Sequence, residues 1–594
     1  MKFFKNLIAA TLGTLLALFL VVIVLFISII SSSGEPEPYI RSNSILKMEI
    51  SGNLPARAMQ NPLDEFLNQT NNSVSIETLK ENLSKAAVHD NIKGVLLEID
   101  FVSAGWANLE EAHRVISAFR DSSDKFIYAK TNDIGYNEQG YFLATAADSV
   151  FSPPESFFEF DGFLSQITFY TGLFEKIGIE AEIARHGKYK SAVEPYYQKE
   201  LSEESEYQLN QLIGKVSSTF VNAVHKKSGK TVDEINALLN EQPRMMVSFA
   251  YENNLVDSLL YDHQLESLVK SRIGIEQDES FHMVSSSRYA KVSTQTAGLK
   301  TETTSDKIAV IYASGIILPE LNQGAFGNQQ GITASFFEEQ LKEVREDDDV
   351  KALVIRVNSP GGSGSTSDEI WNMIEQTKKE MPVIVSMGPT AASGGYYIAM
   401  AADSIVAEPT TVTGSIGVFS TKFNAKQLFN EELGITFDEV KSHNHADWLL
   451  PSGGFSPAEE KAFQQFVDTF YDTFITKVAN ARGMTKDEVD SIAQGRVWTG
   501  ADAKEQNLVD VLGGMDKALA IAAEKAGIEQ YDLSILPKKK DLLQILMGNA
   551  QVKVQSLLGN SLLNNNQLME ANNHLRILKQ RGVLALLPYE IAIQ

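Results

Sequence analysis

Tyr141-Phe-Leu-Ala-Thr-Ala-Ala-Asp-Ser149 and Tyr396-Tyr-Ile-Ala-Met-Ala-Ala-Asp-Ser404 are two copies of one short pattern, 255 residues apart. Four ordered matches at a nearly constant offset indicate a duplicated domain, because the period is far longer than that of a solenoid repeat. The other three pairs, separated by 253 to 258 residues, are Gly94–Asp100 with Ala352–Asn358, Gly178-Ile179 with Gly434-Ile435, and Asn254–Asp257 with Asn507–Asp510.

Each copy predicts the same alternation of helices and strands. Apolar residues recur at three- and four-residue spacing in Ile76–Val88 and in Ala334–Val344, which predicts a helix at the start of each copy. A short apolar strand, a second helix, a second strand and a helix through the Ala-Ala-Asp-Ser segment follow. This alternation is typical of an α/β fold with a largely parallel sheet. The predicted strands are Gly94–Ile99, Lys125–Ala129, Ala352–Val357 and Pro382–Ser386.

The N-terminal segment resembles a membrane anchor. Leu7 to Ile30 carries no charge, and as a helix of about 36 Å it would cross a hydrocarbon core of about 30 Å. Lys2 and Lys5 precede it, which favours a cytoplasmic N-terminus. No Ala-x-Ala cleavage site follows, so an uncleaved anchor is favoured over a signal peptide. We expect a single pass through the inner (cytoplasmic) membrane, with the remaining chain on the periplasmic, extracytoplasmic side.

Composition divides the chain into five parts. The stretch near residues 285–306 is rich in Ser, Thr, Lys and Gln, as a linker should be. After Leu536, Lys538-Lys-Lys540 opens a tail with Leu-rich stretches, for which packing on the body is favoured over a neighbouring subunit or the membrane surface. The predicted parts are residues 1–45 (cytoplasmic N-terminus, transmembrane helix and spacer), 46–285 (N-terminal repeat), 286–305 (linker), 306–536 (C-terminal repeat) and 537–594 (C-terminal tail).

The composition excludes several functional classes. Asp and Glu outnumber Lys and Arg by 76 to 52 in 594 residues, a formal net charge of −24. Such a balance argues against a nucleic-acid partner and against tight binding to anionic lipid. The absence of cysteine excludes thiol catalysis and thiolate metal sites. His443-Asn-His445-Ala-Asp447 lacks a second group of ligands, so we predict a solvated loop there, and no metal or cofactor.

Ser393 is the candidate nucleophile. It stands in Thr390-Ala-Ala-Ser-Gly-Gly-Tyr396, where glycines allow another backbone to approach closely and leave the Gly394 N–H free to bind an oxyanion. The predicted strand–turn–helix step places Ser393 near a helix N-terminus, which favours negative charge. The first copy has Glu138 at the equivalent position, so this turn occurs only in the second copy. The alternative is an ordinary turn of small residues.

A second glycine-rich loop, Asn358-Ser-Pro-Gly-Gly-Ser363, follows a predicted buried strand. Its backbone N–H groups, together with that of Gly394, would form a two-donor oxyanion hole. Taken alone, this loop is equally compatible with an ordinary turn.

Lys190 is the candidate base, because no histidine near Ser393 has the context of a catalytic triad. It occupies the position of Ala446 in the second copy. Each copy thus carries one candidate group that the other lacks, and copies that face each other would bring the two together. A lysine is a base only when neutral, and burial away from carboxylates lowers its pKa by several units. The hydroxyl of Ser415 can orient the amine; the alternative is a solvated surface lysine.

Four motifs together resemble the signal peptide peptidase A family in its long, duplicated form, also called protease IV. The likeness covers the anchor, both repeats and the order of the motifs, and leaves the tail loosely matched. It implies tandem duplicated crotonase/Clp-like domains with a Ser–Lys dyad. The motifs are Tyr189–Pro195, Asn358–Gly362, Ala391–Tyr396 and Thr413–Gly417.

The resemblance also implies the role of each site residue. Ser393 would be the nucleophile, Lys190 the general base and Ser415 the group that orients the lysine. Gly394 and Gly362 would donate hydrogen bonds to the oxyanion, with Gly361 a close rival to Gly362. Lys188 would suit the chemistry equally well, and only the family motif selects Lys190.

The resemblance implies a serine endopeptidase that degrades cleaved signal peptides and other apolar peptides, works without metal or cofactor and assembles into a homotetramer. Two other classes are compatible with the fold: an enzyme similar to acyl-CoA hydratases and isomerases, which would stabilise an enolate with the same N–H groups, and a non-catalytic membrane scaffold. The sequence leaves open whether Lys190 and Ser393 meet within one subunit or between two.

Overall fold

The structure, a computed structural model, describes residues 37–58, 74–132, 134–241, 245–299, 304–320, 331–538 and 582–587, with a few isolated positions elsewhere. The predicted anchor Leu7–Ile30 lies almost entirely outside these ranges. Within them, no helix has the length and apolar character needed to span a bilayer.

The first repeat is built on a parallel sheet with the strand order β8-β5-β3-β2-β1-β9. The second repeat reproduces this order as β20-β16-β15-β13-β10-β21, again with parallel neighbours. The identical order confirms the predicted duplication of an α/β unit. The strands are β1 (Ser44–Gly52), β2 (Ile92–Val102), β3 (Phe126–Lys130), β5 (Ser149–Ser152), β8 (Ser258–Leu259), β9 (His282–Ser285), β10 (Lys307–Ser314), β13 (Val350–Ser359), β15 (Val383–Ala392), β16 (Ser404–Ala407), β20 (Val511–Leu512) and β21 (Asp532–Leu536).

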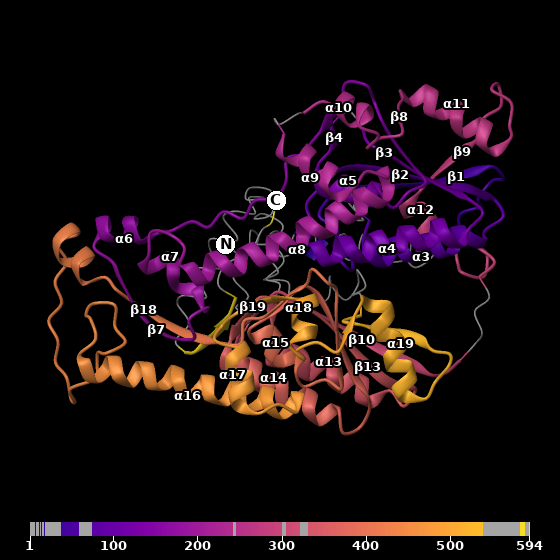
Figure 1. The fold of residues 1–594 in the computed structure, drawn as a ribbon. Coiled ribbons are helices and arrows are strands. Elements are labelled where there is room, and N and C mark those ends of the chain that lie inside the picture. The colour runs from indigo at the N-terminus through magenta and orange to yellow at the C-terminus, as the bar shows by residue number, and fades with distance from the viewer. Residues whose placement is uncertain are drawn as a thin grey trace.

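Helices pack on both sheets, and Figure 1 shows the two repeats as separate halves with α3 and α4 between the sheets. The helix predicted at Ile76–Val88 is α3, with those bounds, and the one predicted at Ala334–Val344 is α13 (Ala334–Glu346). The Ser75 hydroxyl caps α3 and that of Thr333 caps α13, each by accepting a backbone N–H bond. The other larger helices are α4 (Trp106–Ser122), α8 (Glu203–Ser228), α11 (Asp262–Ile273), α14 (Gly364–Thr377), α16 (Pro457–Arg482) and α19 (Met515–Ala526).

Shorter elements complete the described fold. The short helices and helical turns are α5 (Glu138–Ala144), α6 (Thr171–Ile177), η1 (Ser191–Val193), α7 (Glu194–Tyr197), α9 (Val232–Asn240), α10 (Val247–Glu252), α12 (Ser286–Ala290), α15 (Gly394–Ala399), η2 (Leu428–Glu432), α17 (Lys486–Ile492) and α18 (Gly500–Glu505). The short strands are β4 (Gly135–Tyr136), β6 (Phe157–Phe158), β17 (Val412–Gly414) and β19 (Val497–Thr499). Helix α12 lies in the predicted linker range and packs against α3 and β1.

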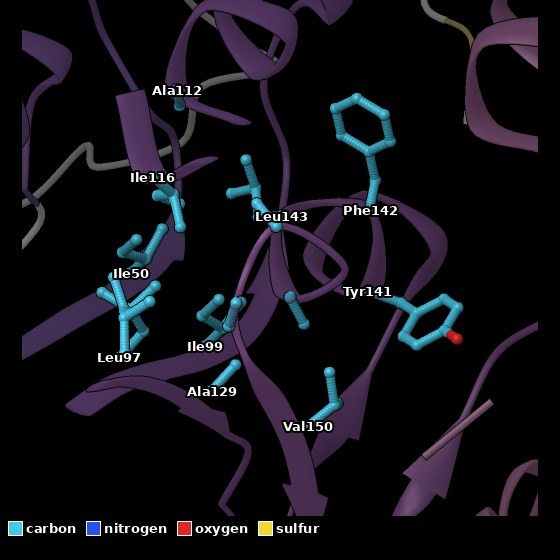
Figure 2. Packing of buried hydrophobic residues seen from close by; sticks show 14 of the residues in the cluster. Ile50, Leu97, Ile99, Ala112, Ile116, Ala129, Tyr141, Phe142, Leu143 and Val150 are labelled. Atoms are coloured by element: carbon cyan, nitrogen blue, oxygen red, sulfur yellow. The ribbon is translucent and has the colours of Figure 1, made fainter. Parts of the chain in front are cut away.

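The repeated motif has a structural role in both copies. The Tyr141 hydroxyl donates to the Leu255 carbonyl at 2.6 Å, and its counterpart Tyr396 donates to the Leu508 carbonyl at 3.0 Å. The aspartate of each motif accepts from the backbone N–H near the start of a strand, Asp148 from Ile127 and Asp403 from Val383. Figure 2 shows the apolar part of the first copy packed between β2, β3, β5 and the helices α4 and α5. The repeated residues thus make equivalent hydrogen bonds in both sheets, and those of the tyrosines are buried.

A third sheet joins the two repeats, with the order β12-β11-β14-β22-β18-β7. Strand β7 lies between β5 and β8 of the first repeat in the chain, yet it pairs antiparallel with β18 of the second repeat over seven residue pairs. This pairing brings the segment after β7, which contains Lys190, to the second repeat. The strands are β7 (Glu180–His186), β11 (Ile316–Ile317), β12 (Gly331–Ile332), β14 (Gly361–Ser363), β18 (Val418–Asn424) and β22 (Leu584–Leu586).

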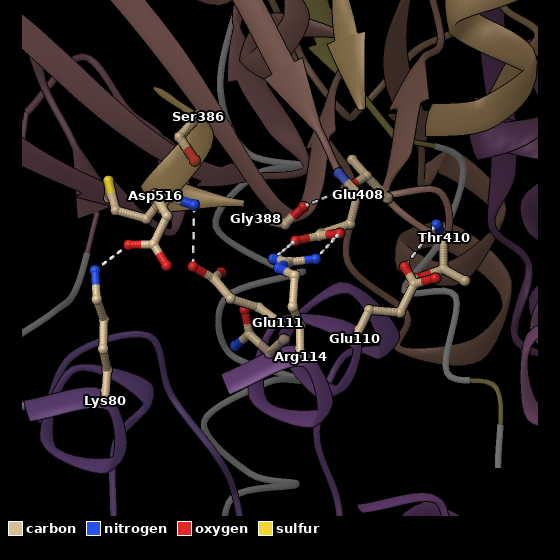
Figure 3. Close-up of polar contacts among 12 residues, drawn as sticks. Lys80, Glu110, Glu111, Arg114, Ser386, Gly388, Glu408, Thr410 and Asp516 are labelled. Atoms are coloured by element: carbon tan, nitrogen blue, oxygen red, sulfur yellow. Dashed lines mark hydrogen bonds and ion pairs between the residues drawn. The ribbon is translucent and has the colours of Figure 1, made fainter. Parts of the chain in front are cut away.

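Polar side chains of α4 hold the repeats together (Figure 3). Arg114 pairs with Glu408 at 2.5 Å, and Glu111 pairs with the buried Arg356 at 2.7 Å. Breaking a buried pair leaves one uncompensated charge, which costs about 3–5 kcal/mol. These contacts fix how the two repeats face each other.

Glu110, also on α4, makes this interface pH-dependent. Burial raises its pKa from 4.5 to about 7, although the Thr410 N–H and hydroxyl both donate to it. A carboxyl group with a raised pKa binds more protons in the folded state, so stability is lost as the pH rises from 4.5 through about 7. We expect Glu110→Gln to reduce the fall in melting temperature between about pH 5 and about pH 8 by about 2 °C or more. Differential scanning calorimetry that finds the same fall in both proteins would contradict this assignment.

Candidate active site

Ser393 lies at the turn between β15 and α15 with φ 55° and ψ −114°. Such a backbone conformation costs a residue with a side chain about 1–3 kcal/mol, and it is typical of functional sites. Two backbone bonds hold it: its N–H donates to the Gly414 carbonyl, and its carbonyl accepts from Tyr397 N–H, both at 2.8 Å. A β-carbon on Gly395 would approach the Ser359 carbonyl oxygen to 2.6 Å. The turn therefore needs glycine after the serine.

Lys190, Ser393 and Ser415 meet in one buried site within one chain. The Nζ atom of Lys190 lies 2.7 Å from Ser393 Oγ, 3.0 Å from Ser415 Oγ and 3.1 Å from the Ser415 carbonyl oxygen. All three side chains are fully buried. The structure thus brings together the three residues that the sequence singled out, although they come from separate copies of the repeat.

Burial favours the neutral form of the Lys190 amine. Burial lowers its pKa well below the ordinary value, and it is the only cause of the shift, so among the described residues no carboxylate offsets it. A neutral amine has two N–H groups and one lone pair. Nζ donates to both oxygens of Ser415 and to Ser393 Oγ when it is charged; in the neutral form the two oxygens of Ser415 can accept its two N–H groups, which leaves the lone pair for the Ser393 hydroxyl.

Buried polar contacts fix the loop that carries Lys190. The buried carboxylate of Glu194 accepts from the hydroxyls of Ser202 at 2.7 Å and Ser205 at 2.8 Å. These bonds tie the loop to the start of α8. The segment that carries Lys190 is therefore fixed, on the C-terminal side of the lysine, to helix α8 of the first repeat.

Gln208 on α8 connects this loop to the second repeat. Its Nε2 donates to Ser191 Oγ at 2.8 Å, and its Oε1 accepts from the Val497 N–H at 3.2 Å. Because Val497 belongs to β19, the amide fixes the lysine loop against the sheet that carries the serine. Nothing in the sequence distinguishes this glutamine from a surface residue of an amphipathic helix.

The glycines predicted to form the oxyanion hole lie beside Ser393. The Gly361 N–H donates to Ser359 Oγ at 3.2 Å, which makes Gly362 the better candidate of the two rivals. A β-carbon on Gly361 would lie 2.6 Å from the Gly394 nitrogen, so a glycine keeps the space in front of that N–H open. Strand β14, which contains Gly361 and Gly362, packs against α15, which begins at Gly394.

The first copy has no comparable site at the equivalent turn. Glu138, the counterpart of Ser393, accepts from the backbone N–H of Asp161 at 2.8 Å. Burial raises its pKa to about 7. In segment 443–447, both histidines are exposed. The Nδ1 atom of His445 lies 2.7 Å from Glu459 Oε1.

Comparison with known proteins decides the family. The profile of peptidase family S49 matches residues 121–275 and 375–529, one match in each repeat, and that of Clp protease matches residues 326–411. The chain belongs to peptidase family S49. It is therefore a serine protease, and the two alternative classes raised by the fold are set aside.

Named relatives of this S49 peptidase cover most of its length. It is 35% identical to "Serine protease SPPA, chloroplastic" of Arabidopsis thaliana over 83% of this chain and 71% of that protein. It is 30% identical to "Protease 4" of Salmonella typhi over 86% of this chain and 83% of that protein. It is 36% identical to "Putative signal peptide peptidase SppA" of Enterococcus faecium over 40% of this chain and 67% of that protein.

Gly495 is a site residue of this S49 peptidase that the sequence did not indicate. It has φ 77°, and a β-carbon on it would lie 2.5 Å from Lys190 Cβ. Its N–H donates to the Ile416 carbonyl at 2.8 Å, beside Ser415. This glycine forms the wall behind the lysine. It lies outside the motifs that carry the family resemblance, so only its contacts reveal it.

Replacing Gly495 should therefore displace the lysine. We expect Gly495→Ala to lower kcat by about 10²-fold, the usual cost of misplacing a catalytic group by about 1 Å. Gly453→Ala is the matched control, because a β-carbon there meets nothing within 4 Å. Steady-state kinetics on a peptide substrate, with thermal unfolding to check the fold, test this. Equal rates for the two variants would show that Gly495 does not position Lys190.

Proposed function

We propose that this chain is a membrane-anchored serine endopeptidase in which Ser393 is the nucleophile and Lys190 the general base, and that it degrades cleaved signal peptides and similar apolar peptides. The observation that carries the proposal is the 2.7 Å contact between Lys190 Nζ and Ser393 Oγ, made by an amine whose pKa burial lowers well below its ordinary value. Such a pair meets the distance and protonation requirements of nucleophile and base.

Acylation follows from this geometry. The lone pair of Lys190 takes the Ser393 proton while Oγ attacks the scissile carbonyl carbon of the peptide. The N–H groups of Gly362 and Gly394 hold the oxyanion of the tetrahedral intermediate. The peptide C–N bond then breaks, and the Lys190 ammonium gives its proton to the leaving nitrogen.

Deacylation repeats these steps with water. Lys190 removes a proton from a water molecule that attacks the ester of Ser393, and it returns that proton to Oγ as the acid product leaves. Throughout the cycle the hydroxyl and carbonyl oxygens of Ser415 accept hydrogen bonds from the Lys190 amine, and so they direct its lone pair to Ser393. Ser415 is therefore a positioning residue.

Apolar surroundings of the site support an apolar substrate. Val193 and Phe419 belong to one buried apolar cluster beside the site, and Ala392 and Val497 belong to another. The relative named as a signal peptide peptidase agrees with this chemistry. Released signal peptides are apolar and would leave few polar groups unpaired beside such side chains.

Location and assembly complete the proposal. Leu7–Ile30 would anchor the chain in the inner membrane, with the catalytic part on the periplasmic side. The segment between η2 and α16 exposes large apolar side chains, which are typical of subunit interfaces. We infer a homotetramer in which this segment is covered by a neighbouring subunit. The exposed residues are Leu433, Ile435, Phe437 and Val440.

Substitution of either member of the pair should abolish activity. We expect Ser393→Ala and Lys190→Ala each to lower kcat by about 10⁴-fold or more, as in other nucleophile–base pairs. Lys188→Ala is the matched control, because Lys188 is exposed and lies over the Tyr189 ring instead of in the site. Peptide hydrolysis by the purified variants measures this. Near-normal activity in Lys190→Ala would refute the assignment of the base.

The pH dependence of peptidase activity should change when a charge is placed beside Lys190. Activity requires the neutral amine, so it falls as the pH drops through the lowered pKa of Lys190. Ser415→Asp places a carboxylate at the amine and should move the acidic limb of the kcat/KM profile upward by about 1–3 pH units. Ser415→Asn is the neutral control, and both residues tolerate the φ of 50° found there. Profiles with the same acidic limb for the two variants would show that Lys190 is not the titrating base.

A further inference from the structure

Aromatic rings from both repeats surround Arg496, which follows the glycine behind Lys190. The guanidinium carbon of Arg496 lies 3.8 Å from the centroid of the Trp498 ring, 5.1 Å from that of Tyr207 and 5.4 Å from that of Tyr189. Tyr207 belongs to α8 of the first repeat, and Trp498 belongs to β19 of the second. A cation within about 6 Å of a ring centroid is attracted to the ring face. We call these three rings the aromatic cage.

Ring contacts, and not ion pairs, hold this guanidinium. In the described part of the chain, Arg496 contacts the aromatic cage, and its Nη2 donates to the Tyr207 hydroxyl at 3.4 Å. Its Nε atom is buried and has no hydrogen-bond partner among the described residues. A carboxylate near Lys190 would favour the charged form of the amine. Rings can therefore hold a cation here without opposing the neutral lysine that catalysis needs.

The aromatic cage reaches the lysine through Tyr189, the residue that precedes Lys190. The Tyr189 ring faces Arg496, and the Tyr189 N–H donates to the Gln494 carbonyl at 2.9 Å. Gly495, between these two contacts, forms the wall behind the lysine. Residues 494–496 of the second repeat thus hold both the backbone and the ring of the residue next to the base.

Arg496 also contacts the turn that holds the two serines. Its backbone carbonyl accepts from the Ser415 N–H at 2.7 Å. A β-carbon on Gly414 would approach Cδ1 of Trp498 to 2.8 Å and the Arg496 carbonyl oxygen to 3.0 Å. The Gly414 carbonyl in turn accepts from the Ser393 N–H at 2.8 Å. The ring on which the guanidinium stacks therefore packs against the backbone that fixes the nucleophile.

We propose that Arg496 is a positioning residue of this peptidase, whose guanidinium, stacked in the aromatic cage, holds the Lys190 loop of the first repeat against the Ser393 and Ser415 turns of the second. This inference rests on the proposed roles of Ser393 and Lys190. The arginine acts through the rings of Tyr189 and Trp498 and takes no part in proton transfer.

Steady-state kinetics of Arg496→Met and Arg496→Lys on a fluorogenic apolar peptide test the proposal. Methionine keeps an unbranched, adaptable side chain but removes the cation. We expect it to lower kcat by about 10²-fold and to leave KM unchanged, because misplaced catalytic groups slow the chemical step. Lysine should recover most of the lost rate, because its ammonium group also binds ring faces.

Arg57→Met is the matched control. Arg57 also lies over a ring, with its guanidinium carbon 5.5 Å from the Tyr312 centroid, and its other contacts are with Glu77 and the Pro537 carbonyl. Its loss should leave kcat at the wild-type value.

Rescue by free guanidinium separates positioning from a loss of the fold. Arg496→Ala removes the guanidinium from the aromatic cage, and added guanidinium ions can occupy the space between the rings. At concentrations that leave the wild type fully active, they should raise kcat of this variant by about tenfold, a part of the loss caused by misplacement. Equal concentrations of sodium chloride or urea should not, and Arg57→Ala should not respond.

Each other outcome counts against the proposal. Wild-type kcat in Arg496→Met would overturn it, and so would a raised KM at unchanged kcat, which would assign the arginine to substrate binding. Variants that thermal unfolding shows to be unfolded, and that guanidinium does not restore, would leave Arg496 a role in stability alone. If Ser393→Ala and Lys190→Ala are inactive while Arg496→Met is fully active, only this inference fails. If Ser393→Ala or Lys190→Ala keeps its activity, the proposed function fails as well.

Discussion

A buried lysine amine in contact with a serine hydroxyl is the constraint on which the proposed active site depends. Within the part of the chain that the structure describes, an ammonium group at this position would lack a counter-charge, since only the oxygens of Ser393 and Ser415 lie within hydrogen-bond distance of Nζ. Burial of an unpaired charge is costly, so it lowers the pKa of the amine. The protein must therefore exclude water and carboxylates from around Lys190, and both repeats are needed to do so.

The duplication supplies this enclosure because its two copies keep the same scaffold and differ at the site. The repeated tyrosine and aspartate make equivalent hydrogen bonds in both sheets. The proposed function depends on the positions where the copies diverge, with Ser393 in one and Lys190 in the other. Polar contacts from α4, such as Glu111 with Arg356 at 2.7 Å, hold the two scaffolds in the orientation that lets these residues meet.

The third sheet joins this scaffold to the proposed site. Strand β7 carries the lysine loop to the second repeat, and β14 carries the glycine loop beside the serine. Both strands belong to one sheet, so the same network of backbone hydrogen bonds holds the two loops. Gly361 and Gly495 are closely packed against their neighbours. A side chain at Gly361 would block the space in front of the Gly394 N–H, and one at Gly495 would displace Lys190.

The sequence by itself determined the duplicated α/β architecture and the bounds of helix α3, and it predicted the three side chains that the structure brings together. Periodic apolar residues and turn glycines are local signals, so they can be recognised without coordinates. Only the tertiary structure decided that Lys190 and Ser393 meet within one chain, that Gly495 and Gln208 contact the lysine loop, and that β22 lies between β14 and β18. These features depend on contacts between segments up to several hundred residues apart, and no local pattern of residue types specifies such contacts.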